Sequence, residues 1–438
     1  MKRIDFENGS VTQNIFAAAL PMLVAQILNL LYNIVDRIYI GHIPGSGALA
    51  LTGVGVCMPL IMIISAFAAL VGNGGAPRAS ILMGKKDLDS AENILGNCFT
   101  MQIIISVILT LIMFFGNRTF LMAFGASENT IEYAVSYMNI YSLGTIFVQL
   151  TLGMNAFITA QGFAKTGMYS VLIGAVINII LDPIFIFACH MGVRGAALAT
   201  IISQACSCIW VLSFLFGTRS TLRIKKQNLT LKAPVILPCL ALGASLFIMQ
   251  ASESVISVCF NSSLLKYGGD VAVGAMTILT SVMQFAMLPL QGLAQGAQPI
   301  ISYNYGARRP RKVLRAAVSM ALMALVYTLT IWAVILLAPH FLISIFSSDP
   351  TLQADTIPAM KLYFSTFGFM LLQYVGQTVF KSLNKRRHAV FFSLLRKVII
   401  VVPLTYLLPY AFGMGTDGVF AAEPVSNVIG GSLCFFVM

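Results

Sequence analysis

Long apolar runs separated by short polar segments make up the chain from about residue 16 to its end. A helix that crosses a bilayer needs about 20 mostly apolar residues in a row, and each run is close to that length or longer. The pattern therefore predicts twelve transmembrane helices, at 16–40, 49–73, 94–116, 130–152, 166–190, 194–217, 234–258, 270–296, 312–338, 356–381, 388–412 and 416–438. The last run reaches Met438 without a polar tail, so we expect the terminal helix to be cut short.

The composition excludes a water-soluble protein. Hydrophobic residues make up 58% of the chain and charged residues only 10%, and the mean hydropathy is +0.87. So few polar residues could not cover a surface that faces water. The sequence predicts an all-α membrane protein that is embedded in a lipid bilayer.

The second half of the sequence repeats the first. Three positions in one stretch recur at an offset of 222 residues, since 306−84 = 222, and a second block over a hundred residues away recurs at 223. The matched pairs are Gly74/Gly296, Pro77/Pro299 and Gly84/Gly306, then Gly192/Gly415 and Gly195/Gly418. Six predicted spans per half return the chain to its starting side, so both halves have the same orientation. We expect an N-terminal six-helix bundle at 1–217, a cytoplasmic linker at 218–232 and a C-terminal bundle at 233–438.

Basic residues gather in alternate loops. With a cytoplasmic N-terminus, 22 of the 27 Lys and Arg residues lie on the cytoplasmic side, when Arg396 and Lys397 are counted there as only one or two turns into their span. Cytoplasmic loops of membrane proteins carry such an excess, so both termini are expected in the cytoplasm. Topology thereby explains the net charge of +12, and we expect no nucleic-acid partner.

Polar residues inside the spans indicate where function lies, because lipid makes them costly. Asn178 and Asp182 are four residues apart and share one helix face. At about 1.5 Å per residue, Asp36 lies roughly 6 Å, Asp182 roughly 12 Å and Thr200 roughly 9 Å from the outer ends of their spans. Carboxylate, amide and hydroxyl oxygens suit Na⁺, or a proton held on a carboxylate. These four residues are our candidate coupling-cation site.

Two further features bear on that site. Pro183 has no N–H and so releases the carbonyl of Ile179 next to Asp182. Alternatively, each polar group could merely hydrogen-bond between helices or reach the interface. Arg37 directly follows Asp36, which makes the alternative serious for that residue.

The second half has its own carboxylates. Glu253 answers Asp36 at an offset of 217, and Glu423 stands opposite Thr200 at an offset of 223. Both are candidate substrate-cavity residues. A solvated carboxylate in a cavity wall, without a specific role, explains them equally well.

Several stretches resemble the multidrug and toxic compound extrusion (MATE) family, in its prokaryotic branch. They are LPMLVAQILNLLYNIVDRIYIG, VGNGGAPRASILMGKKD, VINIILDPIFIF, GVRGAALAT, LLKYGGDVAVGAM, GLAQGAQPIISYNYGARR and SLLRKVIIVVPL, and they span nearly the whole chain. The resemblance implies a V-shaped pair of six-helix bundles in a bacterial cytoplasmic membrane. The two bundles would enclose a cavity that opens alternately to either side.

The resemblance also implies residue roles. The family's cation site falls on the four residues already selected, which could hold Na⁺. Asn33 and Asn155 resemble cavity-lining residues, and Pro21 resembles a proline at which the first helix bends. Some relatives carry an essential carboxylate in the tenth helix. The span 356–381 has none beyond its starting loop, so we expect an incomplete cation site in the second half.

We therefore expect a secondary antiporter that exports amphipathic organic cations in exchange for Na⁺ or H⁺. Such a protein needs no cofactor beyond the coupling ion, and we expect it to work as a monomer. The 22 Met and 30 Phe residues would fit an apolar substrate wall. No phosphate-binding loop of the GxxxxGK type is present, so the energy would come from an ion gradient or a partner.

Two alternatives stay open. A lipid-linked oligosaccharide flippase of related architecture would carry anionic cargo and need Lys or Arg deep in its cavity, whereas the basic residues in the predicted spans lie near the ends. A membrane-embedded enzyme would need a nucleophile with a base, or a metal cluster. The four histidines, His42, His190, His340 and His388, are scattered without metal-binding spacing, so we expect no enzyme activity.

Overall fold

The protein is described by a computed structural model that covers residues 4–7, 9–124, 126–344 and 350–438. Within these ranges the chain is helical and forms no β-strand. The first half contains α1 (Val11–Gly41), α2 (Gly47–Gly84), α3 (Leu88–Ala123), α4 (Ile131–Leu143), α5 (Thr145–Ala160), α6 (Ala164–Pro183), the π-helix η1 (Ile184–Ala188) and α7 (Val193–Phe216). The all-α prediction is confirmed.

A short 3₁₀ turn, η2 (Lys226–Asn228), lies in the segment that joins the halves. The second half contains α8 (Ala233–Gly306), α9 (Pro310–Leu337), α10 (Pro339–Ser344), α11 (Pro350–Tyr363), α12 (Phe367–Ser382), α13 (Arg386–Leu394), the π-helix η3 (Leu395–Val401), α14 (Val402–Ala411) and α15 (Gly415–Val437). Gly269 interrupts α8 with a φ of 65°, which divides it into two arms. A left-handed φ suits glycine because it has no Cβ.

The predicted spans differ from the structure at two places. Among the described residues, ten helices are long and apolar enough to cross a membrane, or eleven if α4 and α5 form one span. These two helices meet at 57°, with Gly144 between them. The predicted span 356–381 is likewise divided into α11 and α12, of which α12 has only 16 residues. The twelve predicted spans are therefore not twelve straight helices.

The sequence repeat recurs in the backbone. Helix starts match at an offset of 222, as in 367−145 = 222, and so do residues with left-handed φ. The matched starts are Leu88/Pro310, Thr145/Phe367 and Ala164/Arg386, and the matched left-handed residues are Lys86/Arg308 and Gly162/Asn384. Even the break between α4 and α5 has its counterpart between α11 and α12. The halves are two parallel copies of one fold.

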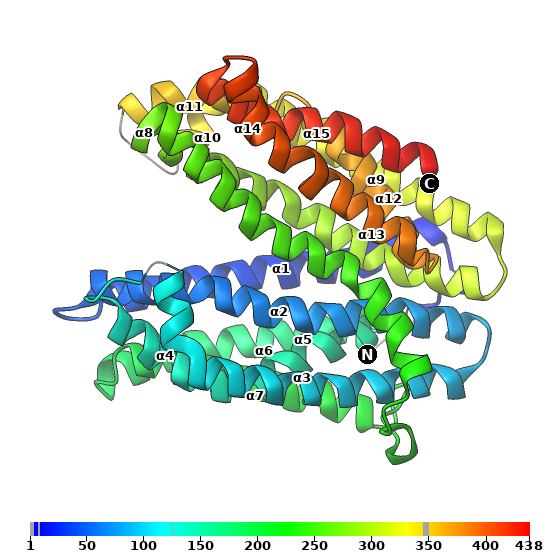
Figure 1. Ribbon diagram of the computed structural model, residues 1–438. Coiled ribbons are helices and arrows are strands. Elements are labelled where there is room, and N and C mark those ends of the chain that lie inside the picture. Colours follow the sequence, from blue (N-terminus) through cyan, green and yellow to red (C-terminus); the bar gives the residue numbers. More distant parts are fainter. Residues whose placement is uncertain (1–3, 8, 125, 345–349) are drawn as a thin grey trace.

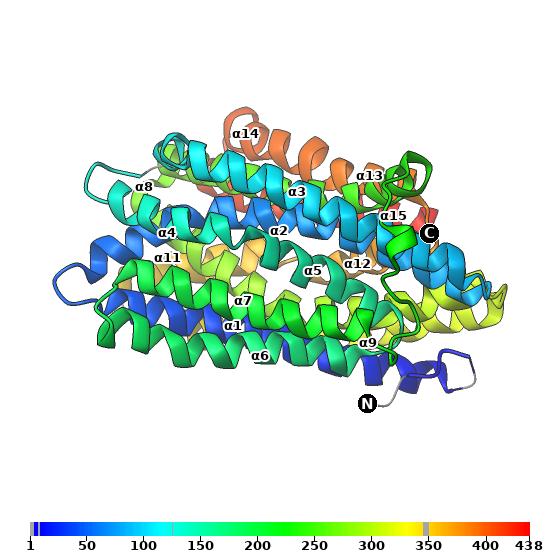
Figure 2. The same cartoon turned by 90° about the horizontal axis from the view of Figure 1, so that it is seen from below.

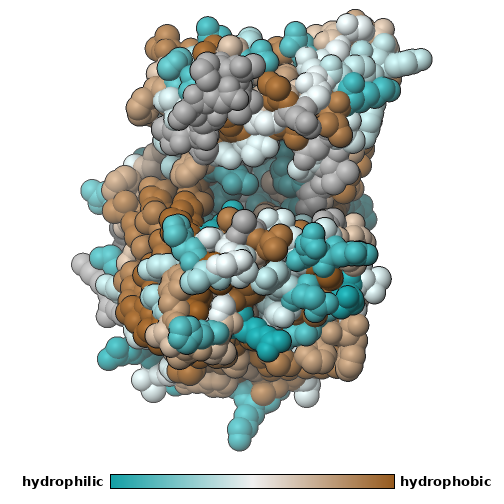
Figure 3. Space-filling model, turned by 90° about the vertical axis from the view of Figure 1, so that its left-hand side faces the viewer, coloured by the Kyte–Doolittle hydropathy of each residue, from teal (hydrophilic) through white to brown (hydrophobic). Residues whose placement is uncertain are grey.

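The two copies lie side by side and diverge toward one end of the molecule. Figure 1 shows α1–α7 as one group and α8–α15 as the other, and the groups meet at the end where the N-terminus lies. Figure 2 shows α1 and α2 among the other helices of the first group, seen from below. Viewed from the end where the groups diverge, the surface is hollowed between them, and hydrophilic residues lie inside the hollow (Figure 3).

Glycines hold the closed end together. A Cβ on Gly84 of α2 would overlap the carbonyl oxygen of Tyr303 on α8, and a Cβ on Gly306 would overlap the carbonyl oxygen of Ile81. Gly74 and Gly243 make a second reciprocal contact of this kind, against the carbonyl oxygens of Cys239 and Leu70. Small residues let helices approach to backbone contact in a membrane. The glycines that reveal the repeat thus include those at the contact between the halves.

Each half also contributes part of one helix to the hydrophobic core of the other half. Val11 and Ile15 of α1 belong to the hydrophobic core of the second half, and Ile236 and Cys239 of α8 belong to a core of the first half. The segment before α1 crosses the same contact. The backbone N–H of Ile4 donates to Gly162 in the first half, and Glu7 pairs with Arg309 in the second half at 2.5 Å.

Candidate functional site

The structure brings the four predicted coupling residues together. Asp36 on α1 and Asp182 on α6 face each other within hydrogen-bonding range. Nδ2 of Asn178 donates to Oδ1 of Asp182 at 3.2 Å and lies 3.5 Å from Oγ1 of Thr200 on α7. The exposed fraction of these four residues is 8% or less. Three helices therefore contribute to one buried cluster.

Several oxygen atoms in this cluster lack a donor. Oδ1 of Asp36, Oδ2 of Asp182 and Oδ1 of Asn178 are buried without a hydrogen-bond partner. None of the ion pairs between described residues includes either aspartate. Two facing carboxyl groups repel each other when both are ionised, and burial strengthens the repulsion. A proton or a small cation between them would relieve it.

The ligand set of the cluster consists of hard oxygen donors. The described residues contain no group of three or more His, Cys, Asp or Glu side chains that could hold a metal ion. Two carboxylates, an amide oxygen and a hydroxyl are hard ligands, typical of alkali and alkaline-earth cations. The composition of the cluster is thus compatible with Na⁺ or with a proton, and it does not resemble a transition-metal centre.

Two tyrosines, the buried Tyr137 and the half-buried Tyr32, adjoin the cluster and were not predicted. Tyr137 on α4 lies near Thr200 and Asp36, and Tyr32 lies one turn before Asp36 on α1. The spacing of four residues between Tyr32 and Asp36 could have identified Tyr32. No sequence signal places Tyr137 there, because α4 contributes no charged residue to the cluster.

A π-helix begins directly after the cluster. The α-helical hydrogen-bond pattern of α6 ends at Pro183, and η1 continues from Ile184 to Ala188. Proline cannot donate to the helix, so the turn around it must rearrange. Single π-helical turns frequently occur at functional sites. The rearrangement is consistent with the free carbonyl that the sequence predicted beside Asp182.

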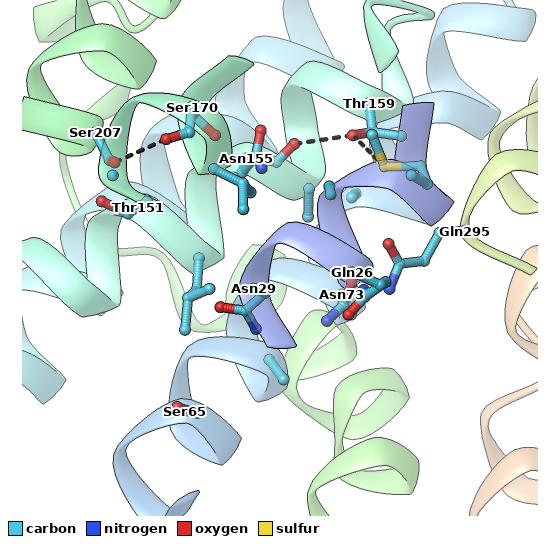
Figure 4. Close-up of a pocket in the computed structure, with 18 of the residues that line it drawn as sticks. Gln26, Asn29, Ser65, Asn73, Thr151, Asn155, Thr159, Ser170, Ser207 and Gln295 are labelled. Atoms are coloured by element: carbon cyan, nitrogen blue, oxygen red, sulfur yellow. Dashed lines mark hydrogen bonds between the residues drawn. The ribbon is translucent and has the colours of Figure 1, made fainter. Parts of the chain in front are cut away.

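A cavity of about 350 Å³ lies between the two halves. Its lining comes from α1, α2, α5, α6, α7 and α8, and no residue in that lining is charged. Eight amide side chains lie in the wall among apolar and hydroxyl-bearing residues, namely Gln26, Asn29, Asn73, Asn155, Gln204, Gln250, Gln295 and Gln298. Figure 4 shows the side chains of Asn29, Asn155 and Gln295 on three different helices that line the cavity.

The expected Met- and Phe-rich wall is wrong for this cavity, although many of its lining residues are apolar. Its lining contains one methionine, Met22, and no phenylalanine. The 22 Met and 30 Phe residues of the chain instead serve elsewhere, since many of the largest exposed side chains, such as Phe115 and Phe436, cover the outer faces. Their abundance follows from the membrane environment and gives no information about the cavity.

The cavity and the carboxylate cluster are neighbours. Tyr32, Gly174 and Ser203 line the cavity, and they lie one helical turn from Asp36, Asn178 and Thr200, respectively. On each of the three helices the cluster residue is the one farther from the closed end. The cluster therefore lies about one turn, roughly 5 Å, beyond the cavity lining toward the open end.

The other predicted first-half residues differ in their positions. Asn155 lines the cavity and has a buried, unpartnered Oδ1. Asn33 is absent from the lining and donates to the carbonyl of Asn29 at 2.6 Å. Pro21 lies inside α1, which is continuous from Val11 to Gly41.

The second-half carboxylates do not form a counterpart of the cluster. Glu423 on α15 has a side chain only 3% exposed, pairs closely with Arg396 and lies 3.4 Å from Lys397. It lies inside the second half and is absent from the cavity lining, so its expected place in the cavity wall is wrong. Glu253 on α8 is 59% exposed in its side chain and pairs with Lys397 at 2.7 Å.

The distribution of basic residues expected from the sequence is wrong at Arg396 and Lys397. We counted them with the cytoplasmic residues, but their side chains are only 3% and 5% exposed. Arg396 follows the start of α13 by ten residues, or about 15 Å along the helix. The statement that basic residues in the spans lie near the ends is therefore wrong. Both bases face carboxylates, however, so they do not create the net positive pocket that an anionic cargo needs.

Comparisons with known proteins agree with this architecture. A sequence model of the MatE family matches residues 21–184 and 245–407. The multidrug export protein MepA of Staphylococcus haemolyticus is 25% identical over 433 residues, which cover 99% of this chain and 94% of that protein.

Solved structures show the same fold. A MATE structure in the bent conformation has a TM-score of 0.93 at 22% identity and covers 100% of this chain and 96% of that one. An outward-facing multidrug resistance MATE transporter of the MOP superfamily has a TM-score of 0.92 at 22% identity, with coverage of 100% and 97%. Because the family match extends over most of both halves, the chain belongs to the MatE family of multidrug efflux transporters.

Proposed function

We propose that the protein is a secondary antiporter that exports amphipathic organic cations in exchange for Na⁺ or H⁺. The observation that supports this most strongly is the buried pair Asp36 and Asp182, whose unpartnered oxygens adjoin a cavity between two pseudo-symmetric halves. Family membership supplies the class of activity. The coupling ion and the substrate charge are our proposals, drawn from the chemistry of these residues.

The cluster can couple ion binding to substrate binding through the repulsion between its two carboxylates. With both carboxyl groups ionised and facing each other, the free energy of the pocket is high, and a cation or proton lowers it. If the ion binds one conformation more tightly than the other, it shifts the population of the two conformations. The same difference in free energy must then alter the affinity for the substrate, because linkage is reciprocal.

The cavity suits a cation of modest polarity. Its amide carbonyls can turn toward a positive charge, and no positive side chain in the lining would repel it. A neutral polar wall also fits varied ligands, since Asn and Gln side chains can donate or accept hydrogen bonds. Asp36 and Asp182, one turn away, would supply negative potential without direct contact.

We further propose that the conformation described here opens outward. The halves meet at the end that carries the N-terminus and the segment around Glu7, Arg309 and Lys312. The positive-inside rule assigns that end to the cytoplasm. A single chain in the bacterial cytoplasmic membrane, with both termini inside, would then alternate between this state and one open inward.

A cellular efflux assay tests the proposal. A bacterial strain that lacks its main efflux pumps and produces this protein should accumulate less ethidium than the same strain with an empty vector, about threefold or more. An ionophore that dissipates both Na⁺ and H⁺ gradients should remove the difference. Equal accumulation in the two strains, with the protein shown to be in the membrane, would contradict export of organic cations.

A further inference from the structure

The second half contains a buried charge cluster that the proposed mechanism does not use. Arg396 and Lys397 lie on η3, a π-helix of seven residues, and Glu423 lies opposite them on α15. Oε1 of Glu423 accepts from Nη2 of Arg396 and from Nζ of Lys397, the latter at 3.4 Å. Nζ of Lys397 also lies 2.7 Å from Oε1 of Glu253 on α8. One ammonium group thus lies between two carboxylates from different helices.

The two halves differ in whether their carboxylates pair with basic side chains. In the first half Asp36 and Asp182 face each other and no basic side chain pairs with either among the described residues. In the second half the repeat offset of 222 to 223 places Leu404 or Thr405 opposite Asp182. The carboxylate of that helix is therefore missing. Lys397 lies about two turns earlier and carries the positive charge that a free ion would otherwise bring.

The cluster reaches the hollow at one point. Gln250 lines the cavity, and residues three apart share a helix face, so Glu253 faces the same hollow one turn farther along α8. Its side chain is 59% exposed, whereas those of Arg396, Lys397 and Glu423 are 3%, 5% and 3% exposed. A ligand that entered the hollow would meet the Glu253 carboxylate and leave the buried members of the cluster in place.

Lys397 would not be left unpaired by such a ligand. If the carboxylate of Glu253 turned toward a ligand, Nζ of Lys397 would keep Glu423 as its partner, which it already contacts. Burying an unpaired ammonium group is costly, so this second partner makes the exchange feasible. Glu423 is in turn held by Arg396 and does not need Glu253.

We propose that Lys397 is a tethered cation that competes with the organic cation for Glu253 and so sets the affinity and charge selectivity of the second-half wall. The ligand is a monovalent, permanently charged aromatic cation, which replaces the ammonium group on the Glu253 carboxylate. A neutral analogue gains nothing from that exchange. This inference rests on the proposed function, because it assumes that organic cations enter the hollow.

Equilibrium binding to purified protein in lipid nanodiscs tests this inference, with radiolabelled tetraphenylphosphonium as the probe. Lys397→Gln frees Glu253, so the dissociation constant should fall about fivefold, the range of a partly exposed ion pair. Lys397→Arg keeps the charge and should leave the constant within about twofold. The double variant Lys397→Gln/Glu253→Gln should lose the whole gain.

Glu253→Gln alone provides a test that does not depend on the folding of the lysine variants. It removes the exposed carboxylate and leaves the second-half cluster with an excess positive charge, so tetraphenylphosphonium should bind about threefold or more weakly. Unchanged binding by Glu253→Gln, or a gain in Lys397→Gln that persists in the double variant, would overturn the inference. If the unmodified protein does not bind tetraphenylphosphonium at all, the proposed function fails instead.

Discussion

Asp182→Asn should abolish gradient-driven efflux while the protein still folds and inserts. The amide keeps the size and hydrogen-bonding capacity of the side chain but cannot release a proton or neutralise a cation. Asp182 is fully buried and faces Asp36, so losing one of two adjacent charges should not destabilise the fold. We expect less than about a tenth of the unmodified rate, because the variant loses an ion-dependent coupling free energy that is typically about 1–3 kcal/mol. The rate of ethidium efflux, compared at matched membrane expression, is the measurement that checks this prediction.

Neighbouring variants serve as controls for that result. Asn178→Ala and Thr200→Ala remove neutral oxygen ligands and leave both carboxylates in place. Under Na⁺ coupling they should raise the Na⁺ concentration needed for half-maximal efflux, whereas under H⁺ coupling they should have a smaller effect. Normal efflux by Asp182→Asn would mean that this carboxylate is structural and that the cluster is not the coupling site.

Gly84→Val should arrest transport by preventing the halves from meeting at their closed end. A Cβ at this position would overlap the carbonyl oxygen of Tyr303, an atom of the backbone that cannot turn aside. Overpacking of this kind costs about 1–3 kcal/mol, which corresponds to a change of about 5- to 150-fold in the conformational equilibrium. We expect efflux to fall below about a tenth of the unmodified rate.

Gly55→Val is the matched control for that variant. Gly55 lies on the same helix, α2, and a Cβ there has no atom within 4 Å. It should keep more than about half of the efflux rate. Similar rates for the two variants would show that the contact at Gly84 does not matter for the transport cycle.

The coupling cluster was predictable because a carboxylate inside a membrane span is costly and is therefore usually functional. Asn178 and Asp182 are one turn apart, and distance from the span ends placed Asp36 and Thr200 at a similar depth. The structure brings all four together. Their role as a cation site stays a prediction, because contact alone does not identify a bound ion.

The repeat was predictable for a related reason. Gly84 and Gly306 lie where the two halves touch backbone to backbone, so no larger residue fits at either position. Helix bends were not predictable, because hydropathy reports only how apolar a segment is. Gly144 and the break before Phe367 interrupt segments that read as continuous apolar runs.

The expected position of Arg396 and Lys397 near the cytoplasm was wrong for a physical reason. Counting turns from the end of an apolar run places Arg396 and Lys397 near the cytoplasm, and long basic side chains often do reach the interface. Their burial depends on Glu423, which is 27 residues from Arg396 on another helix. The amide side chains of the cavity wall are equally hard to predict from a single sequence, because they come from five different helices.

Transport by the purified protein in proteoliposomes, with a Na⁺ gradient or an H⁺ gradient imposed separately, is the decisive test of ion-coupled antiport. We expect an outward-directed organic cation flux, measured with ethidium, to follow one of the two gradients in the unmodified protein. Neither gradient should drive it in Asp36→Asn or Asp182→Asn. Ethidium flux that is equal with and without an imposed gradient, or that persists in both variants, would contradict ion-coupled antiport through this pair of carboxylates.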